Sequence, residues 1–258
     1  MSENGKPRVA FFDFACCEGC QLTVVDSLQT HLDLLDAVDI VEFREAISDQ
    51  SDDYLVAFIE GSCTRESDEA RLKKIRERAA VVVALGACAH TAGLNALKNL
   101  HPLEDVREWV YGDKADWYDT YAARPISAVI EVDAVIPGCP IDREEFVSVV
   151  KALLMGKTPP VPDYPVCVEC KLKENVCLLL EGKPCMGPVA RAGCDAICPT
   201  YGDGCEGCRG LIPHPNDNAM KDVLEEAGLT VDQVMSRMTM FNTYPLQEKE
   251  AVAGEEVK

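Results

Sequence analysis

Residues 8–20 read RVAFFDFACCEGC, a run of apolar and aromatic side chains that ends at three cysteines. The composition of Arg8–Phe14 predicts a buried β-strand. The segment after the cysteines, Gln21–Leu35, repeats apolar side chains at helical spacing, which predicts a helix with one buried face. A strand, a cysteine-bearing loop and a helix therefore follow one another at the start of the chain.

The same alternation continues through the first part of the chain. Four more short runs of apolar or β-branched side chains predict strands at Asp39–Phe43, Tyr54–Ile59, Ala80–Leu85 and Ala134–Ile136. Helical spacing recurs at Glu66–Arg78 and Arg143–Met155. Strands that alternate with helices predict an α/β domain, in which helices cover both faces of a parallel sheet. Residues 101–124 fit this scheme poorly, and we interpret them as a long crossover or insertion.

The charge and composition exclude several classes of function. The chain has 258 residues, with 44 acidic against 25 basic side chains and a net charge of −19, which argues against a nucleic-acid or anionic-lipid surface. The longest apolar run, Ala79–Ala89, is too short to span a bilayer, so we expect no direct membrane insertion. The first residues carry neither a signal peptide nor a twin-arginine pattern, so we expect a cytoplasmic protein. In that compartment most of the 14 cysteines are expected to be metal ligands rather than to form disulfides.

The composition changes near Gly156. Residues 157–215 hold nine of the 15 prolines and eight of the 14 cysteines, with little helical or strand period. Such a segment cannot build its own apolar core, and bound metal would hold it together. We therefore expect an α/β domain at 7–156, a small cysteine-rich iron–sulfur domain of mostly irregular structure at 157–215, and a helical extension at 216–258. Its polar end, Glu248–Lys258, is expected to fray.

Five early cysteines follow predicted strands. They are Cys17, Cys20, Cys63, Cys88 and Cys139. Because the carboxyl ends of parallel strands share one edge of a sheet, where ligands bind, we expect these thiols to converge. Thiols in a reducing compartment suit either zinc or an iron–sulfur cluster. Cys16 should face the other way, toward the core.

Eight later cysteines have the spacing Cys167-x2-Cys170-x6-Cys177-x7-Cys185-x8-Cys194-x3-Cys198-Pro199-x5-Cys205-x2-Cys208. Eight thiols divide into two groups of four, which suit two zinc sites or two [4Fe-4S] clusters. The hairpin pattern of a zinc ribbon is not visible, and Cys198-Pro199 is similar to the Cys-Pro that ends ferredoxin-type ligand runs. The spacing therefore favours iron–sulfur clusters and leaves zinc as the alternative.

From about Arg8 to Gly210 the sequence resembles the small, electron-transferring subunit of [NiFe] hydrogenases. Four signatures carry the resemblance: C-x2-C at Cys17/Cys20, EGS at Glu60–Ser62, GxCAxxxG at Gly86–Gly93 and PGCP at Pro137–Pro140. It implies a flavodoxin-like domain that holds a proximal [4Fe-4S] cluster through four ligands, the proximal set: Cys17, Cys20, Cys88 and Cys139. Cys63 and Cys16 are extra thiols, either of which could replace Cys20.

The resemblance also divides the later cysteines between two further [4Fe-4S] clusters. The distal set is Cys167, Cys170, Cys177 and Cys185. The medial set is Cys194, Cys198, Cys205 and Cys208. The distal histidine common in the family is replaced here by Cys167, and Cys198 supplies a thiol where some members have proline. We therefore expect three [4Fe-4S] clusters, with all iron bound through cysteines.

The implied function is electron transfer. A partner large subunit would carry the NiFe site, where hydrogen is oxidised or protons are reduced, and electrons would pass through the three clusters to a flavin/NAD(P)- or ferredoxin-type subunit. The motif ACCEGC, the missing export signal and the all-cysteine distal set are most similar to the cytoplasmic, bidirectional class linked to NAD(P). Glu18 and Glu60, near the proximal set, could relay protons.

Two alternatives follow from the same residues. One is an electron-transfer subunit similar to the cluster-bearing subunit of respiratory complex I, which would not act on hydrogen. The other is a zinc-stabilised scaffold protein without a redox role. Iron and acid-labile sulfide would separate the zinc protein from the two iron–sulfur proteins.

Overall fold

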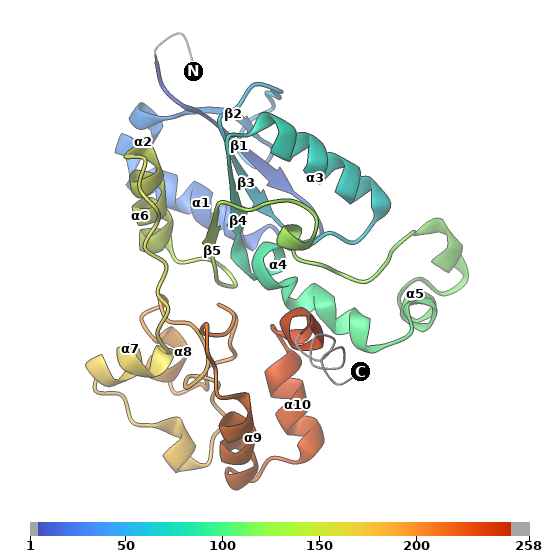
Figure 1. Cartoon of the computed structure of the whole chain (residues 1–258), viewed down its shortest axis with the longest axis vertical. Coiled ribbons are helices and arrows are strands. Elements are labelled where there is room, and N and C mark those ends of the chain that lie inside the picture. Colours follow the sequence, from blue (N-terminus) through green and yellow to red (C-terminus); the bar gives the residue numbers. More distant parts are fainter. Residues whose placement is uncertain (1–4, 249–258) are drawn as a thin grey trace, which may run out of the picture. The chain divides into compact units, whose positions relative to one another are not determined.

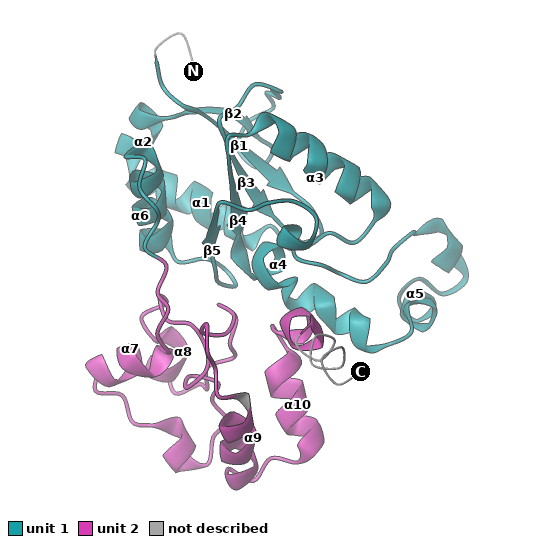
Figure 2. Cartoon of the chain, in the orientation of Figure 1, with its two compact units in different colours: residues 1–160 teal, residues 161–258 magenta. Residues whose placement is uncertain are grey.

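The computed structural model describes residues 5–248 (Figure 1). Most of the frayed tail predicted for residues 248–258 lies outside the described residues. The contacts within the chain divide it into two compact units, residues 1–160 and 161–258 (Figure 2). No helix in the described part of the chain is long and apolar enough to cross a membrane.

Unit 1 is built on a five-stranded parallel sheet in the order β2-β1-β3-β4-β5. The strands are β1 (Arg8–Asp13), β2 (Asp39–Phe43), β3 (Val56–Glu60), β4 (Val81–Leu85) and β5 (Ala134–Ile136). This strand order is that of flavodoxin-like folds. The predicted α/β class is confirmed, and each predicted strand lies within two residues of its observed position.

Helices cover both faces of this sheet (Figure 1). The helices of unit 1 are α1 (Gly19–Thr30), α2 (Leu32–Ala37), α3 (Glu66–Arg78), α4 (Gly86–Thr91), α5 (Leu103–Tyr111) and α6 (Arg143–Leu154), with 3-10 helices η1 (Gly93–Leu100), η2 (Gly112–Trp117) and η3 (Ile126–Ala128). Along β1, Val9 and Phe11 face the core beneath α1, α2 and α6, whereas Ala10 and Phe12 face the core beneath α3 and α4. The alternation of side chains along a strand thus divides the apolar residues between two layers.

Aromatic rings form the centre of the first layer. The ring of Phe11 stacks on those of Phe43 at 4.4 Å and Phe58 at 4.9 Å, and Phe146 of α6 packs at 5.8 Å from Phe58. These rings join β1, β2, β3 and α6.

The single helix predicted over Gln21–Leu35 is interrupted at His31, where α1 ends and α2 begins. Hydroxyl side chains near the end of α1 bind its backbone carbonyl groups and weaken its last turn. Ser27 Oγ donates to the Thr23 carbonyl at 2.8 Å, and Thr30 Oγ1 donates to the Ser27 carbonyl at 3.0 Å. Such bonds compete with the backbone for helical carbonyl groups.

Unit 2 contains short helices and loops. Its elements are α7 (Val166–Leu172), η4 (Leu178–Glu181), α8 (Ile197–Thr200), α9 (Asp217–Glu226) and α10 (Val231–Thr239). Met220 and Leu224 of α9 and Val234 of α10 pack into one core with Met186 and Val189 of the cysteine-rich segment. The two last helices therefore supply the apolar side chains that the cysteine-rich segment lacks.

Phe146 tests the packing of the first layer. Its side chain is buried. Replacing Phe146 with Ala should lower the free energy of unfolding by about 3–5 kcal/mol, because truncating a buried aromatic side chain leaves a cavity. Urea unfolding of anaerobically purified protein, followed by circular dichroism, measures this change.

Leu154→Ala at the end of the same helix is the control, since Leu154 is 41% exposed. Its cost should stay near 1 kcal/mol. Equal losses for the two variants would contradict the central place of Phe146.

Candidate metal centres

The register of the parallel strands brings four loops to one edge of the sheet. Asp13 pairs with Glu60, Glu60 with Leu85, and Leu85 with Ile136. These four residues lie side by side at or near the carboxyl ends of β1, β3, β4 and β5. The loops that begin after them carry the early cysteines, so those cysteines start from a common edge.

The four cysteines of the proximal set lie together at this edge. The pKa of Cys88 is raised to about 12, first by burial and then by the nearby charges of Cys139 and Cys17. Burial also raises the pKa of Cys20, with Glu60, Cys139 and Cys88 adding to the effect. The charge of one ionised thiol changes the pKa of another only at short range, so these cysteines lie close to one another.

Cys16 lies at the margin of the same group and not in the apolar core, where we expected it. Its side chain is half-buried, and its pKa is raised to about 12 by burial first and then by the charges of Glu60 and Cys88. Its sulfur is therefore close to the proximal set.

Cys63 is not brought to this group. Its side chain is buried in the opposite apolar layer, and its sulfur lies 3.0 Å from the Tyr121 hydroxyl oxygen, within hydrogen-bond distance. Burial raises its pKa, and the charges that act on it come from Arg124 and acidic side chains, not from cysteines. The prediction that Cys63 converges with the other early thiols is wrong, because its side chain points to the other side of the sheet.

Glu60 binds the backbone at the start of α1 through its side-chain carboxylate. Its side chain is buried, and its carboxylate accepts hydrogen bonds from the backbone N–H groups of Cys20 at 3.1 Å and Gln21 at 2.9 Å. Burial raises the pKa of Glu60, although these two bonds act in the opposite direction. Glu60 therefore fixes the backbone of one cysteine of the proximal set.

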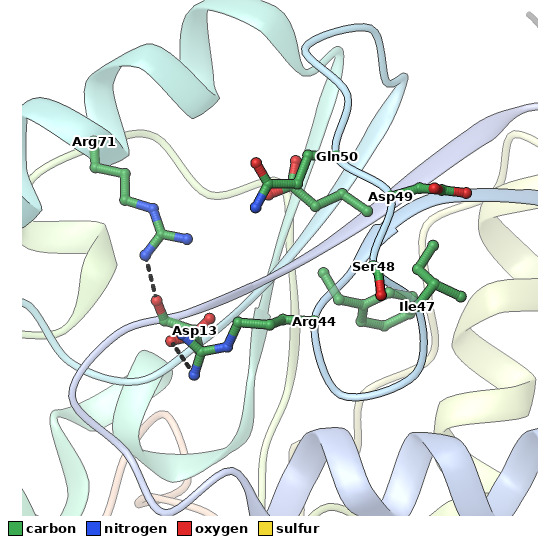
Figure 3. Close-up of a pocket in the computed structure, with 9 residues that line it drawn as sticks. Asp13, Arg44, Ile47, Ser48, Asp49, Gln50 and Arg71 are labelled. Carbon is green, nitrogen blue, oxygen red and sulfur yellow. Dashed lines mark hydrogen bonds and ion pairs between the residues drawn. The ribbon is translucent and has the colours of Figure 1, made fainter.

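Glu18 lies between the cysteines of the C-x2-C motif in a left-handed conformation, with φ of 64°. Arg44 donates to Glu18 Oε1 at 2.9 Å and pairs with Asp13 at 3.3 Å. Arg71 donates to the Asp13 carbonyl at 2.7 Å, and its guanidinium lies over the Phe14 ring at 4.7 Å. Both arginines line a cavity of about 390 Å³ beside the loop (Figure 3). Together their side chains hold Asp13 and Glu18, at either end of the loop between β1 and α1. The sequence did not predict these contacts, because neither arginine belongs to a motif.

The four cysteines of the distal set form a second group, within unit 2. The pKa of Cys167 is raised to about 11, first by burial and then by the charges of Cys185, Cys170 and Cys177. A Cβ atom on Gly187 would lie 3.3 Å from Cys185 Sγ and 3.4 Å from Cys167 Sγ. The absent side chain of Gly187 leaves room beside two of the sulfurs.

The four cysteines of the medial set form a third group beside the second. The pKa of Cys198 is raised by burial and then by Cys194. The pKa of Cys205 is raised by burial, with contributions from Cys185, Cys208 and Cys194. The Cys205 backbone N–H donates to Cys185 Sγ at 3.2 Å, so one hydrogen bond joins the medial and distal sets.

The donors present fit iron–sulfur clusters. Each set offers four thiols, and thiolates are the ligands that such clusters prefer. Glycines give space at the sulfurs, since a Cβ on Gly86 would lie 2.3 Å from Cys20 Sγ. Within residues 5–248, no three His, Cys, Asp or Glu side chains lie close enough to surround one metal ion. The fit to an iron–sulfur cluster, which is larger than a single ion, rests on the sets of four thiols and on the space that these glycines leave.

Replacing Glu60 with Ala should lower the free energy of unfolding by about 1–3 kcal/mol, because two N–H groups at the start of α1 lose their acceptor. The measurement is urea unfolding followed by circular dichroism. The exposed Glu77→Ala is the matched control, and its cost should stay within about 0.5 kcal/mol. A Glu60→Ala variant as stable as this control would show that the two hydrogen bonds contribute nothing.

Known proteins with similar sequences and folds identify the family of this chain. Residues 17–153 match the family model described as "NADH ubiquinone oxidoreductase, 20 Kd subunit". Sulfhydrogenase 2 subunit delta of Pyrococcus furiosus is 37% identical over 237 residues, covering 91% of this chain and 98% of that protein. The solved structure of an NAD+-reducing [NiFe]-hydrogenase in the H2-reduced state matches with a TM-score of 0.54 and 27% identity, over 61% of this chain and 96% of that chain.

An actinobacterial-type NiFe-hydrogenase from Ralstonia eutropha has the same fold over 98% of this chain and 90% of that chain, with a TM-score of 0.57 and 16% identity. The α/β sheet followed by a cysteine-rich region is thus the fold of hydrogenase small subunits. The predicted resemblance is confirmed, and the chain belongs to the family of small, electron-transferring subunits of [NiFe] hydrogenases.

Proposed function

We propose that this chain relays electrons between the NiFe site of a partner large subunit and a flavin/NAD(P)- or ferredoxin-type subunit through three [4Fe-4S] clusters. The observation that carries the proposal is the grouping of the cysteines into three sets of four. Four thiols are what one [4Fe-4S] cluster requires.

The ligand assignments follow the three sets. Cys17, Cys20, Cys88 and Cys139 hold the proximal cluster, the medial set holds the middle one, and the distal set holds the last. Cys16 remains the alternative to Cys20, since its sulfur lies near Cys88. The hydrogen bond between Cys205 and Cys185 supports consecutive roles for the medial and distal sets.

When bound, such clusters supply one-electron carriers. The chain's own residues bind them and limit the access of water. Burial raises the pKa of Cys88 and Cys167 above that of a free thiol, so these side chains would release protons on binding iron. Loading of the sites therefore releases protons and becomes more favourable as the pH rises.

Of the two carboxylates proposed as proton relays, Glu60 is the better placed. It is buried beside Cys20, and that burial raises its pKa. Glu18 pairs with Arg44 toward the surface.

The acceptor is inferred from a relative, and the compartment from the absence of an export signal in the first residues. A relative solved as an NAD+-reducing [NiFe]-hydrogenase supports a flavin/NAD(P)-type acceptor. We propose a cytoplasmic complex of this chain with the large subunit and that acceptor subunit.

Metal and sulfide analysis of the anaerobically purified complex tests the cluster count. The expected result is about 12 iron and 12 acid-labile sulfide per copy of this chain, beyond the iron of the large subunit, with a brown colour. Three electron paramagnetic resonance (EPR) signals should appear on reduction with hydrogen.

A colourless protein with zinc and without sulfide would overturn the proposal in favour of the zinc scaffold. Clusters that are reduced by other donors but never by hydrogen would favour the complex I-like alternative.

Gly86→Ala tests the proximal set. Gly86 has φ of 81°, and the added Cβ would collide with Cys20 Sγ. The variant should lose about four iron per chain and lose electron transfer from hydrogen to an artificial acceptor, since the proximal cluster would no longer be held.

The matched control is Gly112→Ala, which has a similarly unfavourable φ of 57° but no atom within 4 Å of the added Cβ. It should keep its iron. If Gly86→Ala keeps as much iron as this control, Cys20 is not held against Gly86 as a ligand.

A further inference from the structure

Glu169 makes contacts that no cysteine motif requires. It lies on α7 between Cys167 and Cys170 of the distal set. Its Oε1 accepts a hydrogen bond from the Gly193 backbone N–H at 2.7 Å, and its Oε2 accepts one from the Ala196 N–H at 3.1 Å. Both carboxylate oxygens therefore bind one loop, 193–196, which contains Cys194 of the medial set.

This loop has an unusual backbone. Asp195 and Ala196 have φ of 56° and 47°, so two consecutive residues other than glycine adopt the left-handed conformation. Side chains disfavour this conformation, and surrounding contacts have to maintain it. Glu169 supplies two of these contacts, and the ion pair between Asp195 and Lys173, the residue directly after α7, supplies another at 2.6 Å.

The loop fixes two cysteines of the medial set. Cys194 lies within it, and α8, which carries Cys198, begins at Ile197 directly after Ala196. The direction in which α8 leaves the loop depends on the conformation of Ala196. Contacts from α7 therefore fix the direction from which Cys194 and Cys198 approach their cluster.

The carboxylate also places charge beside the medial set. Both oxygens accept backbone N–H groups, as an ionised carboxylate does. The two donors lie at either side of the Cys194–Asp195 pair, so the negative charge lies next to Cys194. A fixed negative charge near a cluster disfavours its reduced form, which is the more negative one.

We propose that Glu169 is a positioning residue that links the distal and medial sets. From the helix that carries two distal cysteines, it holds the loop that orients two medial cysteines. Its negative charge lowers the reduction potential of the medial cluster. This inference rests on the proposed function. Its mechanical part acts through the loop conformation, and its electrostatic part acts through the charge, so two variants separate them.

Glu169→Ala removes both parts. In the intact hydrogenase complex this variant should lose about a third of the iron and sulfide of this chain, one cluster of three, together with the medial EPR signal. Adding Ala196→Gly should restore much of the lost iron, because glycine adopts the left-handed conformation without a steric penalty. Loss of iron that the second substitution fails to restore would overturn the mechanical part, as would an unchanged iron content in Glu169→Ala.

Glu169→Gln retains one oxygen acceptor and removes the charge. It should retain most of its iron, and the reduction potential of the medial cluster should rise in redox titrations followed by EPR. The control is Glu174→Gln, an exposed carboxylate just after the same helix, which should leave that potential near the wild-type value. Equal potentials in Glu169→Gln and the control would overturn the electrostatic part.

These outcomes are distinct from failure of the proposed function. Wild-type complex without iron and sulfide in this chain would refute the function itself. Wild-type complex with three clusters, beside variants of Glu169 indistinguishable from it, would refute only the role of Glu169.

Discussion

The register of the parallel sheet is the constraint on which the proximal site depends. Asp13, Glu60, Leu85 and Ile136 are aligned across four neighbouring strands. Cysteines of the proximal set follow three of them within a few residues, and Glu60 itself binds the backbone at Cys20. A shift of one residue in any strand would turn its following loop toward the opposite layer. The packing of the Phe11, Phe43 and Phe58 rings against α6 opposes such a shift, so the apolar core and the site are fixed by the same pairing.

Unit 2 holds its cysteines in place by another means. Its residues up to 248 form no sheet, and its cysteines lie on short helices and loops that polar contacts and a small apolar core hold in place. Glu169, the Lys173–Asp195 pair and the hydrogen bond from Cys205 to Cys185 connect segments that bear different cysteines. In unit 1 a single buried carboxylate, Glu60, serves a comparable purpose at the start of α1.

Much of the fold could be predicted from the sequence, together with the position of the early cysteines after strands. The division of the later cysteines into two sets was implied only by the family resemblance. Strands with continuous apolar composition and cysteines placed directly after them are local patterns, and parallel pairing then implies their convergence. Cys63 could not be placed in this way, because the direction of one side chain after a strand depends on the turn that follows. Its partner Tyr121 comes from the insertion at 101–124, whose conformation has no periodic signal. Arg44, Arg71 and Glu169 act through contacts between distant segments, which no spacing encodes.

The hydrogen bond between the Cys205 N–H and Cys185 Sγ also bears on kinetics. Electron tunnelling between two carriers slows steeply as the gap between them widens. If the medial and distal sets bind clusters as proposed, a direct bond from the Cys205 backbone to the Cys185 sulfur leaves little freedom for that gap to fluctuate. Along this part of the pathway the transfer rate would thus be set by driving force and reorganisation, rather than by rare thermal approaches of one carrier to the next.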